Sequence, residues 1–336
     1  MKKITTIAIC LSFVINGLAQ RNWKNVDEQF GPLPQNFHVY FSNDSAQDGK
    51  PFIAYYIKVP LSEKSLIFDA DTAYKRRLTP TAFFEKNEKP VLVVNCTFFS
   101  FESNRSLNMV VKNGKVLDYG EYSISLRGKD TMQYRHQLQS NFGILKKNNS
   151  ADIAWAHSSP DYKYPYALEY PVKWYKDSTK VFTREMALKM QPSAENKHDL
   201  DALHPEFYKK WKVKTAIGGG PVLVQNGRAF ITNIDEGKFS GKEGLTEKHP
   251  RTLIGYTAKN ELVIMAIQGR YPNVAHGASL QQCAQLMIEV GCIEAMNLDG
   301  GGSSCMLING KNTIQPSDKN GIQRPVPAVF VIKQKK

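Results

Sequence analysis

The sequence predicts an α+β fold, a single compact domain of mixed, largely antiparallel sheets that are built from hairpins and accompanied by a few helices. Three observations support this class. The Asn-Gly pairs at 113–114, 226–227 and 309–310 each separate two apolar runs, which is typical of tight hairpin turns that need positive φ. Short apolar segments of strand length outnumber segments with a helical period. The 336 residues also carry enough apolar side chains for a substantial core.

The first 20 residues have the order of a secretory signal peptide. Lys2 and Lys3 precede an apolar run at 4–15, and the small residues Gly17 and Ala19 follow it. The run is too short to span a bilayer, and no later segment reaches the length of a transmembrane helix. We therefore expect residues 1–20 to be a signal peptide, and the mature chain to be periplasmic or secreted without a transmembrane segment.

Residues 21–90 are predicted to form N-terminal strands and loops, including a strand at 52–59, that lead into a main domain at 91–336. Further strands are expected at 91–95, 252–257, 261–268 and 326–332. One helix has a complete signature. Ser279 and Gln282 form a capping box, Gly291 ends the helix, and one apolar stripe lies between them. The stripe consists of Leu280, Cys283, Ala284, Met287 and Ile288.

Residues 150–212 are expected to be an aromatic-rich insertion in the main domain. Its tyrosines and Trp174 alternate with prolines, which favours an extended loop over a helix. Aromatic faces stack on sugars, so an accessory sugar subsite is one hypothesis. The more usual role of such residues is to anchor a long loop to the body of a domain.

The chain is basic, with a formal net charge of +13. Its Lys and Arg residues are scattered, and it contains no recognised nucleic-acid module, so we expect no nucleic-acid partner. A solvated surface is the simplest explanation of the charge, and an anionic glycan or phosphodiester is the second.

Four cysteines follow the predicted signal peptide: Cys96, Cys283, Cys292 and Cys305. None forms a Cys-x-x-Cys pair and no histidine cluster has zinc spacing, which disfavours thiolate metal ligation. An exported compartment permits disulfides, whose pairing stays open. Their apolar contexts favour small buried hydrophobic side chains.

The most informative segment is 297–306, which reads Asn-Leu-Asp-Gly-Gly-Gly-Ser-Ser-Cys-Met. We expect a loop at the carboxyl end of a buried strand at 292–297, followed by a hairpin at 304–308. A carboxylate, three glycines and two hydroxyls can bring backbone N–H groups and small donors to one concave point that suits an oxyanion or a sugar. The alternative is that Asp299 is an Asx-turn residue that only shapes the loop.

This segment closely resembles the signature of the phosphodiester glycosidase family. Other segments agree in the same order: 95–99 (Asn-Cys-Thr-Phe-Phe) resembles the family's Asn-Gly-Gly-Phe-Phe strand end, and 217–227 resembles its Gly-Pro-x-Leu-Val-x-Asn-Gly hairpin. Segments 249–255, 269–270, 316–318 and 324–326 match in residue type. The resemblance runs from about residue 91 to the end, with an interruption at 150–212.

The resemblance implies an exported hydrolase that cuts a sugar 1-phosphodiester or a related glycosidic bond. Asp299 is the candidate base, nucleophile or oxocarbenium stabiliser, Arg251 and Arg270 would hold the phosphate, and His249 is a candidate proton shuttle. Substrate-binding roles are expected for Asn95, Gly219, Gly220, Asn297, Gly300, Gly301, Gly302, Ser303, Ser304 and Arg324. No cofactor is expected, and a divalent metal ion beside Asp299 is left open.

The sequence departs from the family pattern at two places. Gln268 stands where the family has Asp before Gly-Arg, and Cys96 and Thr97 replace a glycine pair. The first change removes a carboxylate, so a mechanism with two acids is in question. A sugar 1-phosphodiester has a weakly basic phosphate monoester as its leaving group, so one carboxylate with cationic donors can suffice where an ordinary glycoside needs two acids.

Two other functions compete with this one. The same loop suits a hydrolase or processing factor for a plain envelope polysaccharide, and the loss of the acid at Gln268 suits a non-catalytic glycan-binding envelope protein. Structural roles also compete residue by residue: Arg251 as a strand-edge residue, and His249 as a hydrogen-bonded loop histidine.

Overall fold

The computed structural model describes residues 21–120, 123–125, 134–136, 139–158, 164–169, 171, 209–239, 242–318 and 321–335. The predicted signal peptide and most of the aromatic residues of the predicted insertion, including Trp174, lie outside the described residues. No helix in the described ranges has the length and apolar character needed to cross a membrane.

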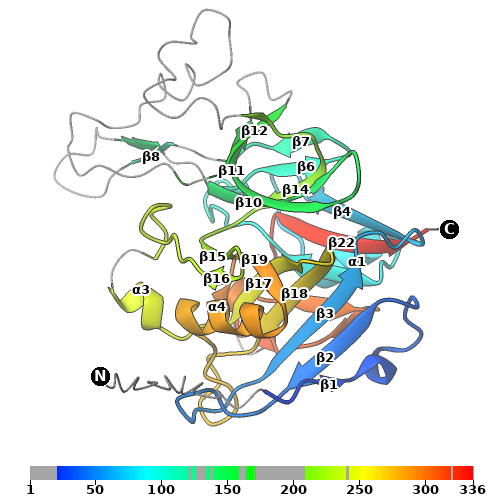
Figure 1. Ribbon diagram of the computed structural model, residues 1–336, viewed down its shortest axis with the longest axis vertical. Helices are drawn as coiled ribbons and strands as arrows, with labels where there is room; N and C mark the ends of the chain where they lie inside the picture. The colour runs from blue at the N-terminus through cyan, green and yellow to red at the C-terminus, as the bar shows by residue number, and fades with distance from the viewer. Residues whose placement is uncertain are drawn as a thin grey trace, which may run out of the picture.

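Antiparallel sheets dominate the fold, and every described strand pair is antiparallel (Figure 1). The largest sheet has eight strands in the order β1-β2-β3-β18-β17-β19-β15-β16. Its members are β1 (Lys24–Asn25), β2 (His38–Ser42), β3 (Ala54–Pro60), β18 (Glu261–Ile267), β17 (Arg251–Thr257), β19 (Cys292–Asn297), β15 (Val222–Gln225) and β16 (Arg228–Ala229).

A five-stranded sheet and a seven-stranded sheet complete the body. The first has the order β21-β20-β5-β22-β4, with β21 (Lys311–Asn312), β20 (Met306–Ile308), β5 (Leu92–Asn95), β22 (Ala328–Gln334) and β4 (Leu66–Thr72). The second has the order β13-β12-β11-β10-β14-β6-β7, with β13 (Lys209–Lys210), β12 (Pro165–Leu168), β11 (Ala151–Ser158), β10 (Gln139–Leu145), β14 (Val213–Gly218), β6 (Val110–Lys112) and β7 (Lys115–Asp118). A separate ribbon pairs β8 (Ser123–Ser125) with β9 (Tyr134–His136).

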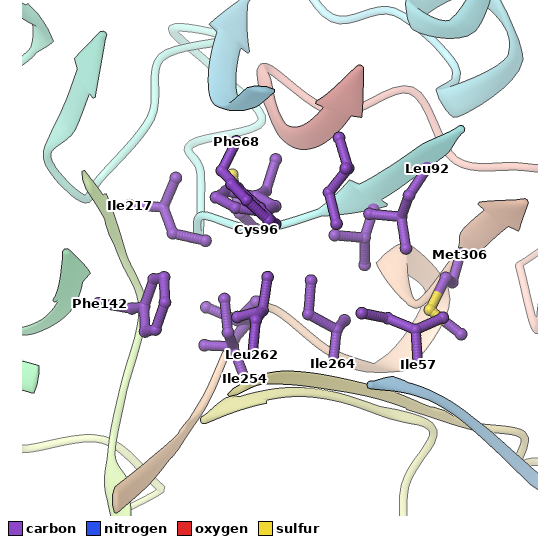
Figure 2. Close-up of a cluster of buried hydrophobic side chains, with 14 of the residues drawn as sticks. Ile57, Phe68, Leu92, Cys96, Phe142, Ile217, Ile254, Leu262, Ile264 and Met306 are labelled. Carbon is purple, nitrogen blue, oxygen red and sulfur yellow. The ribbon is translucent and has the colours of Figure 1, made fainter. Parts of the chain in front are cut away.

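The main core lies between these three sheets, and its side chains come from strands that are far apart in the sequence (Figure 2). The labelled members are Ile57, Phe68, Leu92, Cys96, Phe142, Ile217, Ile254, Leu262, Ile264 and Met306. On the other face of the eight-stranded sheet, α4 (Leu280–Glu289) packs Cys283 and Met287 against Leu253 and Met265. The central strands are therefore buried on both faces, which explains their continuous apolar runs.

The local predictions for strands and turns are confirmed, with ends that shift by one or two residues. The three Asn-Gly pairs form the turns β6-β7, β15-β16 and β20-β21, with positive φ at both residues of each pair. The predicted helix is α4, with its capping box at Ser279 and Gln282. The four cysteines that follow residue 20 are buried, as expected, and all four are free.

Two α-helices in the described part of the chain were not predicted. The first, α1 (Pro80–Lys86), has Thr79 as its N-cap, whose side chain accepts a hydrogen bond from the Ala82 N–H at 3.1 Å, and proline at its first position. The second, α3 (Lys242–Thr246), is a single short turn. Sheets nevertheless dominate the described fold more than the term α+β suggests. Residues 21–90 share these sheets, because β3 pairs with β18 and β4 pairs with β22.

Candidate active site

The glycine motif lies where two sheets meet. Strand β19 is a central strand of the eight-stranded sheet, and β20 belongs to the five-stranded sheet. The loop between them contains Asp299 and the short 3-10 helix η5 (Gly301–Ser303). The chain therefore crosses from one sheet to the other at this motif, as the loop that the sequence predicted after strand 292–297.

Asn95, at the end of β5, fixes the Asp299 backbone. Its Nδ2 donates to the Asp299 carbonyl at 2.7 Å, while its Oδ1 accepts from the Thr252 hydroxyl at 2.8 Å and from the Cys305 N–H at 3.1 Å. The Asp299 N–H donates to the Cys96 carbonyl at 2.8 Å. Because Asn95 is fully buried, this structure gives it the role of an anchor and no surface to meet a substrate.

Asp299 is partly buried. Removal from water raises its pKa to about 6, while hydrogen bonds from Ser303 and the Gly300 N–H, and the charges of Arg324 and Lys238, oppose the increase. A carboxyl group with this pKa is mostly ionised at neutral pH and can exchange a proton close to it. This is the property expected of a catalytic acid or base.

Arg324 approaches the loop on one side. Its Nε donates to Asp318 Oδ2 at 2.7 Å and its Nη1 lies 3.5 Å from Ser303 Oγ. The hydrogen bond that Arg324 donates to Asp318 raises the pKa of Arg324, so the guanidinium is permanently charged. A Cβ on Gly302 would lie 2.3 Å from Arg324 Nη2, so only glycine admits the guanidinium at this distance.

Arg270 approaches the same loop at Gly301. Its Nη2 lies 3.0 Å from the position that a Cβ on Gly301 would occupy, and Gly301 itself has a φ of +61°. Arg270 is exposed, and no carboxylate among the described residues pairs with it. Two arginines therefore converge on consecutive glycines, and both are placed to meet an anion.

Arg251 is buried beneath the glycine loop. Its side chain is 2% exposed, its Nε donates to the Ala278 carbonyl at 3.0 Å, and its Nη2 donates to the Glu247 carbonyl at 3.2 Å. Its Cδ lies 3.9 Å from the position of a Cβ on Gly300. Arg251 thus supports the glycine loop from the protein interior, and two nitrogens of its guanidinium donate hydrogen bonds to backbone carbonyls.

His249 is engaged elsewhere. Its Nε2 lies 3.2 Å from Glu247 Oε2, and its backbone pairs with Ala278. Within the described residues it has no hydrogen bond to Asp299, so the structure does not bring the predicted proton shuttle to the carboxylate in this conformation.

Gly219 and Gly220, for which the sequence predicts a substrate-binding role, cross the end of β19. The Gly220 N–H donates to the Asn297 carbonyl at 2.7 Å, and Asn297 Nδ2 donates to the Gly220 carbonyl at 3.1 Å. A Cβ on Gly219 would lie 2.7 Å from the Asn297 carbonyl oxygen. This close backbone crossing explains why glycine follows β14, and it makes Gly219, Gly220 and the fully buried Asn297 an inner wall of the site.

Backbone donors of the loop are largely used within the protein. The Gly301 N–H donates to the Pro250 carbonyl at 2.8 Å, and the Gly300 N–H bonds to the Asp299 carboxyl group. Ser303 and Ser304 are both buried, and no protein partner binds the Ser304 hydroxyl in the described part of the chain. An anion at this loop would therefore meet arginine side chains before it met the glycine N–H groups predicted to cradle it.

Gln268 has an internal role. It is 6% exposed, and its side-chain carbonyl accepts from the Gln315 N–H at 2.9 Å. An amide at this position satisfies a backbone donor without bringing a charge into the interior.

Two residues of the site were not predicted from the sequence. Lys238 acts electrostatically on Asp299, and Glu236 is buried close to Lys238. They belong to the segment Asp-Glu-Gly-Lys, whose composition is that of a solvated turn. Nothing local to that segment shows that it folds inward.

Aromatic rings line the surroundings of these charges. The ring of Phe98 lies 4.6 Å from Lys238 Nζ, and the ring of Phe101 lies 5.5 Å from the centre of the Arg324 guanidinium. Phe101 is 63% exposed. The rim of the site thus offers both an apolar ring and fixed cations, a combination that suits an anionic sugar.

A cavity of about 830 Å³ lies elsewhere, between α4, Arg21 and the segment that joins β2 to β3. Arg21, Phe52, Leu286 and Glu289 line it, and none of its lining residues belongs to the Asp299 site. In the described part of the chain, no three His, Cys, Asp or Glu side chains gather as a metal site would require.

Comparison with known proteins confirms the resemblance seen in the sequence. The family model of the phosphodiester glycosidases matches residues 176–333, a range that contains Asp299 and the three arginines of the site. The human N-acetylglucosamine-1-phosphodiester α-N-acetylglucosaminidase is 31% identical over 103 residues, and an uncharacterised SPbeta prophage-derived protein of Bacillus subtilis is 40% identical over 88 residues. These matches cover 29% and 26% of this chain, and only 20% and 13% of the two relatives.

Solved structures extend the likeness to the whole fold. The catalytic domain of the zebrafish N-acetylglucosamine-1-phosphodiester α-N-acetylglucosaminidase, auto-inhibited by its pro-peptide, has a TM-score of 0.56 at 16% identity, over 94% of this chain and 89% of that one. A protein of Burkholderia pseudomallei that is classed as exported has a TM-score of 0.55 at 14% identity, over 85% of this chain and 74% of that one. At these identities the structures show a shared fold.

Proposed function

We propose that this chain, which resembles the phosphodiester glycosidases in sequence and in fold, hydrolyses the glycosidic bond of a sugar 1-phosphodiester at the loop between β19 and β20. One observation carries the proposal. The charge of Arg324, which lies against Gly302, acts on the Asp299 carboxyl group, while Arg270 lies over Gly301 of the same loop. A carboxylate with fixed cations next to it matches a substrate whose reacting carbon becomes positive while its leaving group is an anion.

The bond proposed to break joins the anomeric carbon to the bridging oxygen. Its electron pair leaves with the phosphate monoester, a water oxygen bonds to the anomeric carbon, and the proton of that water passes to a base or to solvent. The Asp299 carboxylate would stabilise the positive charge that develops on the sugar, or accept the water's proton. Since the leaving phosphate is weakly basic, it requires no second carboxylic acid, which is consistent with Gln268.

The arginines would hold the phosphate. Arg324 is oriented by Asp318 at 2.7 Å and lies against Gly302, while Arg270 has an exposed guanidinium over Gly301. Guanidinium groups match phosphate oxygens in geometry and charge. Arg251, whose side chain is buried and bonded to two carbonyls, is assigned to support of the loop.

The sugar proposed first is N-acetylglucosamine, because the human and zebrafish relatives carry that sugar in their names. Export is also part of the proposal. It is supported by the signal-like order of residues 1–20 and by the fold shared with a Burkholderia protein classed as exported. No cofactor enters the proposed mechanism.

The test is the turnover of an aryl ester of α-N-acetylglucosamine 1-phosphate. Wild type is expected to release the sugar, and Asp299→Asn is expected to lower kcat/KM by about 100-fold or more, as for the loss of one group that stabilises transition-state charge. Asp48→Asn, which removes a carboxylate that pairs with Lys248, is the matched control. Equal rates for wild type and Asp299→Asn would remove the catalytic assignment. Binding of the ester without any turnover would favour a glycan-binding protein.

A further inference from the structure

Phe101 lies in the turn of a loop that follows β5, and its side chain is 63% exposed. The Leu107 N–H donates to the Phe98 carbonyl at 2.8 Å, so the loop folds back on itself with Phe101 in its turn. The centre of the Phe101 ring lies 5.5 Å from the guanidinium carbon of Arg324. An exposed aromatic ring therefore borders the arginine that is proposed to hold the phosphate.

Neighbouring side chains fix the position of the Phe101 ring. The Phe99 ring lies against it, with 4.8 Å between the ring centroids and an interplanar angle of 49°. The guanidinium carbon of Arg77 lies 5.0 Å from the centre of the Phe101 ring and 5.3 Å from that of the Phe99 ring. Since these contacts already restrict the Phe101 ring, a ligand that stacks on its exposed part removes little further side-chain entropy.

Arg77 is the second cation at this ring. Backbone pairing brings it close to Arg324, because Leu78 and Val326 exchange hydrogen bonds of 3.0 and 2.8 Å between their N–H and carbonyl groups. No carboxylate in the described part of the chain forms an ion pair with Arg77. A guanidinium that stacks on aromatic faces keeps the N–H donors at its edge for an anion. Arg77 therefore offers a position for a second negative charge, in addition to the phosphate at Arg324.

The position of these groups relates them to one part of the substrate. The Ser303 hydroxyl donates to the Asp299 carboxyl group, and Ser303 Oγ lies 3.5 Å from Arg324 Nη1. In the proposed reaction the sugar carbon meets Asp299 and the phosphate meets Arg324, so the alcohol on the other side of the phosphate continues past Arg324. The ring that borders Arg324 is Phe101, and Arg77 lies on that same ring.

We propose that Phe101 and Arg77 form a subsite for the alcohol side of the phosphodiester, and that this alcohol is ring-shaped and carries a further negative charge. The exposed part of Phe101 stacks on the ring of the alcohol, and Arg77 pairs with its charge. The inference rests on the proposed function, because it assigns the sugar side of the substrate to Asp299. The alternative is that Phe101 only positions Arg324, a role that affects all substrates alike.

Three esters of α-N-acetylglucosamine 1-phosphate separate these roles: the methyl ester, the phenyl ester and the 4-carboxyphenyl ester. The methyl ester has no ring, and only the carboxyphenyl ester carries a second anion. Phe101→Ala is expected to lower kcat/KM about fivefold more for the phenyl ester than for the methyl ester, the size expected of one aromatic contact.

Arg77→Met tests the second anion. It is expected to lower kcat/KM about threefold more for the carboxyphenyl ester than for the phenyl ester, as for an ion pair at an exposed position. Arg76→Met, which removes the same charge from the exposed neighbour of Arg77, is the control and should keep the wild-type ratio between these two esters.

Failure of this inference is distinguishable from failure of the proposed function. If Phe101→Ala lowers kcat/KM equally for the methyl and phenyl esters, Phe101 only positions Arg324, and the subsite is overturned while the hydrolase remains. Equal effects of Arg77→Met on the phenyl and carboxyphenyl esters would overturn the second anion. If wild type cleaves none of the esters, the proposed function fails, and calorimetry then decides the inference. Tighter binding of the carboxyphenyl ester than of the methyl ester, lost in Phe101→Ala, would support the subsite, and equal binding of the two esters would overturn it.

Discussion

The substitution Asp299→Asn is expected to stabilise the folded protein at neutral pH. Burial raises the pKa of the Asp299 carboxyl group from its ordinary 3.8 to about 6. The unfolded chain therefore loses this proton near pH 4, while the folded protein keeps it until near pH 6. Across that window the free energy of unfolding falls as pH rises, because the unfolded state binds fewer protons at this site.

The size of the effect follows from the shift. One pKa unit corresponds to about 1.4 kcal/mol, so the ionised carboxylate costs about 2 to 3 kcal/mol of stability above pH 6, allowing for its partial exposure. An asparagine of the same shape carries no such cost. Asp299→Asn should therefore match wild type below pH 4 and exceed it by about 2 to 3 kcal/mol at pH 7.5, while losing activity.

Urea denaturation at pH 4.0 and pH 7.5 is the assay, with wild type, Asp299→Asn and Asp48→Asn compared at each pH. Asp48 is a control of opposite sign, because a hydrogen bond from Lys248 lowers the pKa of its carboxyl group. Asp48→Asn should therefore lose stability at pH 7.5, where the wild-type carboxylate is ionised. If Asp299→Asn is no more stable than wild type at pH 7.5, the carboxylate is not destabilised by burial, and the reasoning about its pKa fails.

Three further predictions concern the loop. Gly302→Ala places a Cβ 2.3 Å from Arg324 Nη2, so the guanidinium must move; kcat/KM on the aryl ester should fall by about 10-fold or more with thermal stability nearly unchanged. Asn95→Ala removes three buried hydrogen bonds and should cost about 3 kcal/mol in urea denaturation, and a loss below 1 kcal/mol would contradict its role as anchor. Arg270→Met should raise KM for the phosphodiester but leave binding of the neutral sugar unchanged, as calorimetry can check.

The turns and the helix α4 were predictable because their determinants are local. An Asn-Gly pair carries its own preference for positive φ, and the capping box of Ser279 and Gln282 is formed by neighbours in the sequence. Helix α1 had the same kind of signal in Thr79 and Pro80, and it was missed because its apolar residues are few. Strand ends shifted since pairing partners, which are distant in the sequence, decide where a strand stops.

Within the site, the spacing of motifs pointed to Asp299, the arginines, Gly219, Gly220 and Asn297, whereas the internal contacts that these residues make could not be predicted. Asn95 and Asn297 have amide side chains of the kind that bind substrates, and only the three-dimensional structure shows that both are buried and hydrogen-bonded within the protein. Lys238 and Glu236 carry the composition of a surface turn. The burial of Glu236 depends on Ser140 and Trp155 of the seven-stranded sheet, which no local pattern reveals.

The central claim is that the chain cuts the bond between the sugar carbon and the phosphate oxygen. Hydrolysis of the aryl ester of α-N-acetylglucosamine 1-phosphate in water enriched in oxygen-18, followed by mass spectrometry of both products, tests it directly. A glycosidase that uses Asp299 at the anomeric carbon places the label in the free sugar and none in the phosphate product. Label in the phosphate product would show attack at phosphorus and would contradict the proposed function.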